Sequence, residues 1–98
     1  MVKLFGKKVV TIDNSSPDDN WIVNKCDVPV SVCCREIFGA FTLDLQPGSQ
    51  QRIVPDAQAK VLPYGQYSYE NFDYEIGKNQ VWEVRKTGGK LTMAKVKG

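Results

Sequence analysis

Short runs of β-branched and aromatic residues recur along this chain between turn-forming residues. Residues Phe41–Leu45 alternate apolar and polar side chains with a period of two, and in Val81–Lys86 the apolar Trp82 and Val84 are each followed by a charged residue. Long segments with apolar residues at the three- and four-residue spacing of an amphipathic helix are missing. This pattern predicts β-strands that bury one face.

Turn residues between these runs indicate where the strands reverse. Gln46–Ser49 contains Pro47 and Gly48, which suit the central positions of a type II turn. Thr87–Gly89 places a Gly-Gly pair between two alternating runs, which is typical of a hairpin. Such signals recur about every 8–12 residues, as in β-sandwiches and barrels. We therefore expect one all-β domain over residues 1–98, a small antiparallel β-sandwich or partly open barrel of about seven to nine short strands.

The apolar faces of these runs also predict the core. The runs with strand character are Val9–Ile12, Trp21–Cys26, Val30–Arg35, Phe41–Leu45, Gln51–Val54, Val61–Leu62, Tyr67–Tyr69, Phe72–Ile76, Val81–Lys86 and Lys90–Val96. Ala57–Lys60 is the single local hint of helix and is too short to stand alone. The expected core is Trp21, Ile22, Val30, Val32, Phe41, Leu43, Ile53, Trp82, Val84 and Leu91.

Two segments resemble the opening strands of thaumatin-like β-sandwich proteins. Trp21–Cys26 reads Trp-Ile-Val-Asn-Lys-Cys and is similar to the Val-Asn-x-Cys strand of that family, and Leu45–Ser49 follows with a Pro/Gly turn. The resemblance spans about thirty residues. It implies a sandwich. It implies no function, because the family's many cysteines and its acidic cleft cannot be placed on this sequence.

The net charge and the hydropathy of the sequence limit which partners and which cellular compartment we expect for this protein. The net charge of +2 is too small to imply a polyanionic partner by itself, although Lys78–Gly98 carries six basic residues against Glu83. No apolar run reaches the length of about 18 residues that a membrane-spanning helix needs. The basic N-terminus is not followed by the apolar stretch of a signal peptide, which favours a cytoplasmic protein, with a mature secreted chain as the alternative.

The nucleophilic and metal-ligating residues give no enzymatic pattern. The chain has no histidine, so the commonest general base and the commonest metal ligand are both missing. Cys26, Cys33 and Cys34 lack the spacing of a zinc site, and their odd number favours reduced thiols. A bridge from Cys26 to Cys33 or Cys34 stays open as an alternative. We therefore predict no catalytic residue, no metal site and no cofactor.

The most unusual stretch is an aromatic tract with short polar residues between the rings. Tyrosine is enriched at interfaces, and tyrosine beside amide and carboxylate groups also suits a sugar ring. Glu70 and Asp73 make the tract acidic, which disfavours nucleic acid. The predicted binding residues are Tyr64, Tyr67, Tyr69, Asn71 and Tyr74.

These observations favour a non-enzymatic binding module whose partner is a protein or a carbohydrate. One alternative is a small secreted or surface β-protein directed to carbohydrate or membrane. Another is a nucleic-acid-binding barrel that uses the basic C-terminal hairpin; binding of that kind weakens steeply with salt.

Overall fold

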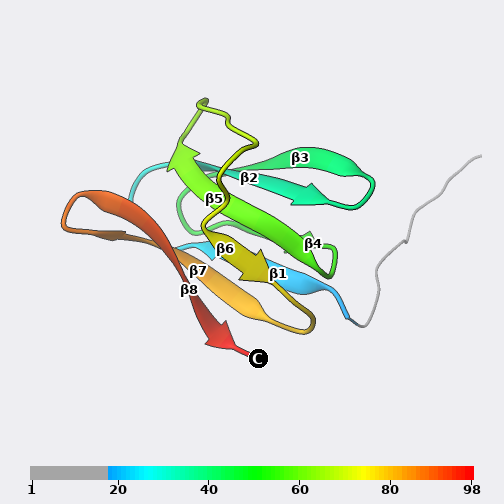
Figure 1. The fold of residues 1–98 in the computed structure, drawn as a ribbon. Helices are drawn as coiled ribbons and strands as arrows, with labels where there is room; N and C mark the ends of the chain where they lie inside the picture. The colour runs from blue at the N-terminus through cyan, green and yellow to red at the C-terminus, as the bar shows by residue number, and fades with distance from the viewer. Residues whose placement is uncertain (1–17) are drawn as a thin grey trace, which may run out of the picture.

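A computed structural model describes residues 18–98 as two four-stranded β-sheets packed face to face (Figure 1). The first sheet has the strand order β4-β1-β7-β8 and the second has the order β3-β2-β5-β6. The strands are β1 (Asn20–Asn24), β2 (Val30–Glu36), β3 (Gly39–Leu45), β4 (Gln50–Ile53), β5 (Ala57–Pro63), β6 (Tyr74–Ile76), β7 (Val81–Thr87) and β8 (Lys90–Lys97). The predicted small β-sandwich is confirmed, and the described strands do not close into a barrel.

Neighbouring strands are antiparallel except in the middle of the first sheet, where β1 and β7 run parallel. Their register places Ile22 beside Trp82 and Asn24 beside Val84. Parallel neighbours need a long connection, and here the whole second sheet and β4 lie between the two strands in the sequence. The predicted run Val9–Ile12 lies outside the described residues.

The core forms where alternate residues of the two sheets face each other. Of the predicted core, Ile22, Val30, Val32, Leu43, Ile53, Trp82 and Val84 are buried, and Phe41 and Leu91 are half-buried against them. The prediction was wrong for Trp21, which lies on the opposite face of β1 from buried Ile22. There the Arg52 guanidinium lies 5.2 Å from the centre of its ring, a distance that suits a cation–π contact.

The glycine turns take the expected backbone conformations. Gly48 has a φ of 81°, which the third position of a type II turn requires. Gly88 and Gly89 have φ values of 59° and 80°, so the β7–β8 hairpin turns through two residues in the left-handed region. Ala57–Lys60, the hint of helix, is instead the start of β5, with Ala57 and Ala59 facing the core.

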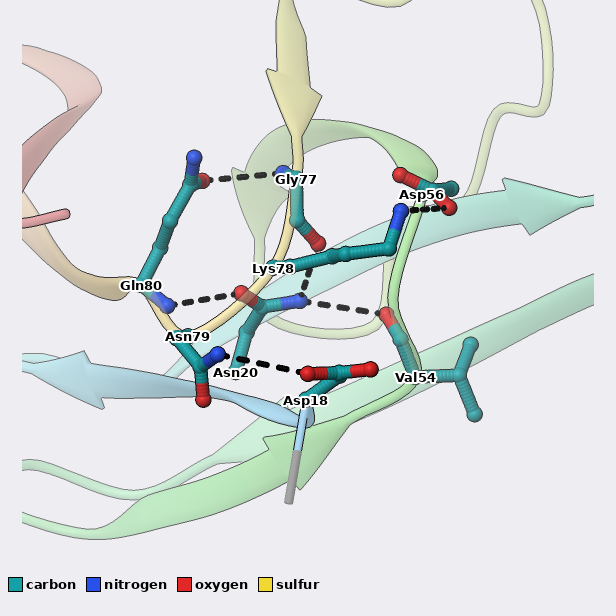
Figure 2. A network of polar contacts seen from close by, with 8 residues as sticks. All are labelled: Asp18, Asn20, Val54, Asp56, Gly77, Lys78, Asn79 and Gln80. Carbon is teal, nitrogen blue, oxygen red and sulfur yellow. Dashed lines mark hydrogen bonds and ion pairs between the residues drawn. The ribbon is translucent and has the colours of Figure 1, made fainter. Parts of the chain in front are cut away.

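Two buried asparagines on β1 join the strand to the loops at its two ends. Asn24 donates its amide to the carbonyls of Val28 and Leu45 and accepts from the Cys26 backbone. The Asn24 backbone also bonds Gly48 and Ser49, so the two segments that resemble thaumatin-like proteins lie together. At the other end, Asn20 holds three loop positions through its amide, as Figure 2 shows.

Candidate functional site

The aromatic tract forms the connection between β5 and β6 and lies across the outer face of the second sheet. Tyr69 shares a hydrogen bond with the Thr42 hydroxyl of β3. The Arg35 guanidinium of β2 lies 5.8 Å from the centre of the Phe72 ring. Beneath this connection Cys33 is fully buried, with its thiol 3.9 Å from the Gln66 carbonyl oxygen. Part of the aromatic tract therefore covers the outer face of the second sheet.

The structure separates the five predicted binding residues. Tyr64 and Tyr67 are half exposed, at 51% and 53%, while Tyr69 is turned onto the sheet. Asn71 is exposed, with a left-handed φ of 55°. Tyr74 lies between the two sheets, edge-on to Trp82 at 5.8 Å between ring centres. The expectation of a strand at Tyr67–Tyr69 was wrong, because these residues belong to the irregular connection.

Tyr67 and its neighbours form the polar part of this surface. The Tyr67 hydroxyl donates to the Asp44 carboxylate at 3.4 Å, and the Ser31 hydroxyl donates to the same carboxylate at 2.7 Å. The negative charge of Asp44 raises the pKa of the Tyr67 phenol above its ordinary value. Tyr67 therefore stays a neutral hydrogen-bonding group, and this patch of Tyr64, Tyr67 and Asp44 is both aromatic and polar.

The most exposed large apolar side chains lie elsewhere, at the turn between β2 and β3. Ile37 is 87% exposed and Phe38 is 89% exposed. Hairpin turns ordinarily carry Gly, Asn, Asp, Ser or Pro. In this turn Gly39, with a φ of 152°, takes the positive φ, and the two turn positions before it hold apolar residues. Ile37 and Phe38 thus break the local rule for turns without packing against the described part of the protein. Such a conflict between local preference and burial is expected at functional positions.

An apolar groove lies beside this turn. It has a volume of about 410 Å³ and is lined mainly by Phe38, Phe41, Leu43, Ile53 and Val54, with Gln51 and the charged Glu36 and Arg52 also in its lining. β3 and β4 are edge strands of different sheets, so the groove opens between the two layers at one edge of the sandwich. A second hollow of about 350 Å³ lies on the other side of the turn, between Ile37 and Asp56. We call Ile37, Phe38 and the lining of the first groove the hairpin-tip surface.

The hairpin-tip surface was not predicted from the sequence, although a signal for it was present. Ile37-Phe38 stands between two alternating runs, Val30–Arg35 and Phe41–Leu45, where a polar turn is expected. A pair of large apolar residues in that place is unusual by itself. The groove could not be found in the same way, because it depends on how β3 and β4 approach across two sheets.

The three cysteines are buried. All three are free thiols in the structure, so the alternative of a bridge from Cys26 was wrong. Cys34 faces the core, where burial, together with the neighbouring Cys33, raises the pKa of its thiol to about 12. Burial also raises the pKa of Cys26. Because the thiolate is the nucleophile, neither Cys26 nor Cys34 is prepared for covalent chemistry near neutral pH. Cys33 lies on the opposite face of β2 from Cys34, where the aromatic connection covers it.

A polar network around Asn20 links the first strand to the loops before β5 and after β6 (Figure 2). Asn20 donates to the Gly77 carbonyl at 2.7 Å and accepts from the Gln80 backbone at 2.8 Å, and the Gln80 side chain accepts from the Gly77 backbone. At its rim the Lys78 ammonium lies 2.7 Å from the Asp56 carboxylate, which raises the pKa of Lys78. The polar groups in this network satisfy one another's hydrogen bonds, and their role is to hold these two loops against β1.

Neither a metal site nor a membrane-spanning helix is found in residues 18–98. No group of three or more acidic or cysteine side chains there is arranged to hold a metal ion. No helix in the same part of the chain is long and apolar enough to cross a membrane. The basic side chains of β7 and β8 belong to the first sheet, whereas Tyr67 and Tyr69 contact the outer face of the second sheet.

No protein-family model, curated protein or solved structure matches this chain.

Proposed function

We propose that this chain is a non-enzymatic binding module that recognises a protein through its hairpin-tip surface. The observation that carries the proposal is the near-complete exposure of Ile37 and Phe38 beside an apolar groove. Leaving two large apolar side chains in water is unfavourable, by about 1.5–3 kcal/mol for each side chain relative to burial. Contiguous exposed apolar surface usually marks an interaction site.

The shape of the surface favours a protein over a lipid bilayer. Phe38 projects from the molecule, while Phe41, Leu43 and Ile53 line a hollow directly beside it. A protein side chain can fill that hollow, and protein interfaces combine protruding anchors with pockets in this way. A bilayer surface would contact the tip and leave the hollow unfilled. Glu36 and Asp56, both near the tip, would also be brought toward the lipid.

The test uses a photo-crosslinking residue at position 38 of the full chain, followed by purification of the protein that is captured. The Kd of that protein is then measured with wild-type chain and with Phe38→Ser and Ile37→Ser. We expect at least a tenfold weaker Kd for each variant with an unchanged melting temperature, as for hot-spot residues. Val96→Ser, another exposed apolar residue on the far sheet edge, is the matched control and should bind as wild type.

Two results would contradict the proposal. Binding that survives both substitutions would place the contact elsewhere. Association of the wild-type chain with neutral or anionic lipid vesicles, lost in Phe38→Ser, would instead favour the membrane alternative.

A second candidate function, carbohydrate binding, is supported by Tyr64, Tyr67 and Asp44. The two rings are half exposed, and the Asp44 carboxylate lies 3.4 Å from the Tyr67 hydroxyl. A ring face beside a fixed acceptor suits a sugar, and Asn71 and Tyr69 lie on the same connection. A glycan array with wild type, Tyr64→Ala and Tyr67→Ala tests this function. A glycan bound by wild type and lost in both variants supports it, while an array with no signal argues against it.

A further inference from the structure

We infer that the partner of the hairpin-tip surface is a second copy of this chain, paired antiparallel along the edge of β3. The two second sheets would then form one continuous eight-stranded sheet. This inference rests on the proposed function, because it names the protein that the same surface binds.

β3 is the least protected edge strand in the described part of the molecule. Edge strands expose unpaired backbone groups, and proteins block them with short length, lysine, proline or bulges. β4 has four residues, β6 has three, and β8 carries Lys90, Lys95 and Lys97 with a register shift near its end. β3 has seven residues, GAFTLDL, with no lysine, arginine or proline and a regular register against β2. It can therefore accept another strand (Figure 1).

Two copies of β3 that pair antiparallel over their full length place compatible side chains opposite each other. Thr42 is the central residue of Gly39–Leu45, so only a two-fold axis at Thr42 pairs all seven residues. That register places Thr42 opposite Thr42 and Ala40 opposite Asp44 of the second copy. No like charges meet, and threonine pairs are favourable across antiparallel strands. An axis at Asp44 would instead place two carboxylates opposite each other.

The inward face gains burial in the same register. Phe41 and Leu43 of β3 line the groove, and Phe41 is only half-buried. With the axis at Thr42, Phe41 lies opposite Leu43 of the second copy, so an apolar row continues from one core to the other. Extending the register brings Phe38 next to Gln46 of the second copy, beside its Gln46–Ser49 turn. The exposed tip thus becomes part of the interface.

The test introduces opposite charges at position 40 and measures the dimer Kd by sedimentation equilibrium of the full chain. Ala40→Glu places a carboxylate opposite Asp44 of the second copy, twice in each dimer, and should raise the dimer Kd about tenfold. Ala40→Lys should lower it about threefold by adding two opposite-charge pairs. Within one chain Ala40 lies opposite Arg35. The substitution that weakens the dimer should therefore stabilise the monomer, and the one that strengthens the dimer should destabilise the monomer. Glutamate there favours the monomer fold and lysine disfavours it, which separates association from stability.

Thr92 provides the matched control, because it lies opposite Arg85 on the edge strand β8, as Ala40 lies opposite Arg35 on β3. Thr92→Glu and Thr92→Lys should leave the dimer Kd unchanged. A wild-type chain that stays monomeric at high micromolar concentration overturns the inference. A dimer that responds equally to both charges at position 40 also overturns it. If the chain is monomeric but Phe38→Ser loses a captured foreign protein, the proposed function stands and only the inference fails.

Discussion

Asn20 and Asn24 show how much of this fold depends on single polar side chains. Both are fully buried on the inner face of β1, one on each side of Ile22. Each makes three hydrogen bonds to backbone groups of neighbouring loops. A buried amide is tolerated only when it is satisfied in this way. These residues therefore fix the loops at both ends of the sandwich.

Replacing Asn24 by aspartate should destabilise the protein by about 3 kcal/mol or more at pH 7. The introduced carboxylate cannot donate to the carbonyls of Val28 and Leu45, and it would be buried without a cation. Its pKa in the folded state should be raised, so the loss should be smaller at pH 4 than at pH 7. Urea unfolding at both pH values measures this. Asn71→Asp, at an exposed position, is the control, and an equal loss in the two variants would contradict the interpretation.

The buried thiol of Cys34 predicts a loss of stability at alkaline pH. Burial raises its pKa to about 12 in the folded protein, against an ordinary value of 9.0 for a cysteine thiol. Between these values the unfolded chain has lost the thiol proton and the folded chain retains it, so stability falls as pH rises, by at most about 1.4 kcal/mol per pH unit. Urea unfolding of wild type and Cys34→Ala from pH 8 to pH 11 isolates this effect. The difference between the two should shrink with rising pH; a constant difference would contradict the prediction.

At the level of elements, the connection between β5 and β6 acts as the outer layer of the second sheet. It covers Cys33 and bonds Thr42 and Asp44 through tyrosine hydroxyls. Residues in such a connection can be half exposed for binding and still support the sheet. Tyr69 belongs to the supporting part, and Tyr64 to the exposed part.

Removal of the Tyr69 ring should therefore uncover Cys33. We expect Tyr69→Ala to raise the rate of Cys33 alkylation at least tenfold, while Cys26 and Cys34, which face the core, stay protected. Mass spectrometry of each cysteine-containing peptide after timed alkylation measures the three rates separately. Equal increases at all three cysteines would mean global unfolding instead of local uncovering.

Local signals predicted some elements well and misassigned others for physical reasons. The β7–β8 hairpin was predicted because its information lies within a few residues, in Gly88-Gly89 and the alternating runs. Ala57–Lys60 gave a hint of helix because alanine favours helix, but it begins β5, where Ala57 and Ala59 face the core beside Ile76 and Tyr74 of β6. Tyr67–Tyr69 has strand propensity, but its hydroxyls bond across the sheet face and no neighbouring strand pairs with it.

The candidate site also has one part that could be recognised from the sequence and another part that could not. Exposure of Tyr64 and Tyr67 agrees with the composition of the tract, yet whether they bind a ligand stays a prediction. Ile37-Phe38 could be recognised from sequence as an apolar turn. The groove beside it could not, because it requires β3 of one sheet and β4 of the other to meet at one edge.

For the whole molecule, the two sheets differ in how far apart their strands lie in the sequence. The second sheet is built from β2, β3, β5 and β6, all within residues 30–76. The first sheet joins β1, near residue 20, to β7, near residue 84, in parallel. Closing so long a loop is entropically unfavourable until other contacts have formed.

The parallel pairing of β1 with β7 also affects the order in which the two sheets can form during synthesis. Synthesis proceeds from the N-terminus, so β1 and its antiparallel partner β4 are made before β7, its parallel partner. The apolar face of the second sheet is then only partly covered, by β1 and β4, until β7 and β8 are released as well. The newly made chain therefore passes through a stage in which part of this apolar face is open, and a chaperone can hold it there.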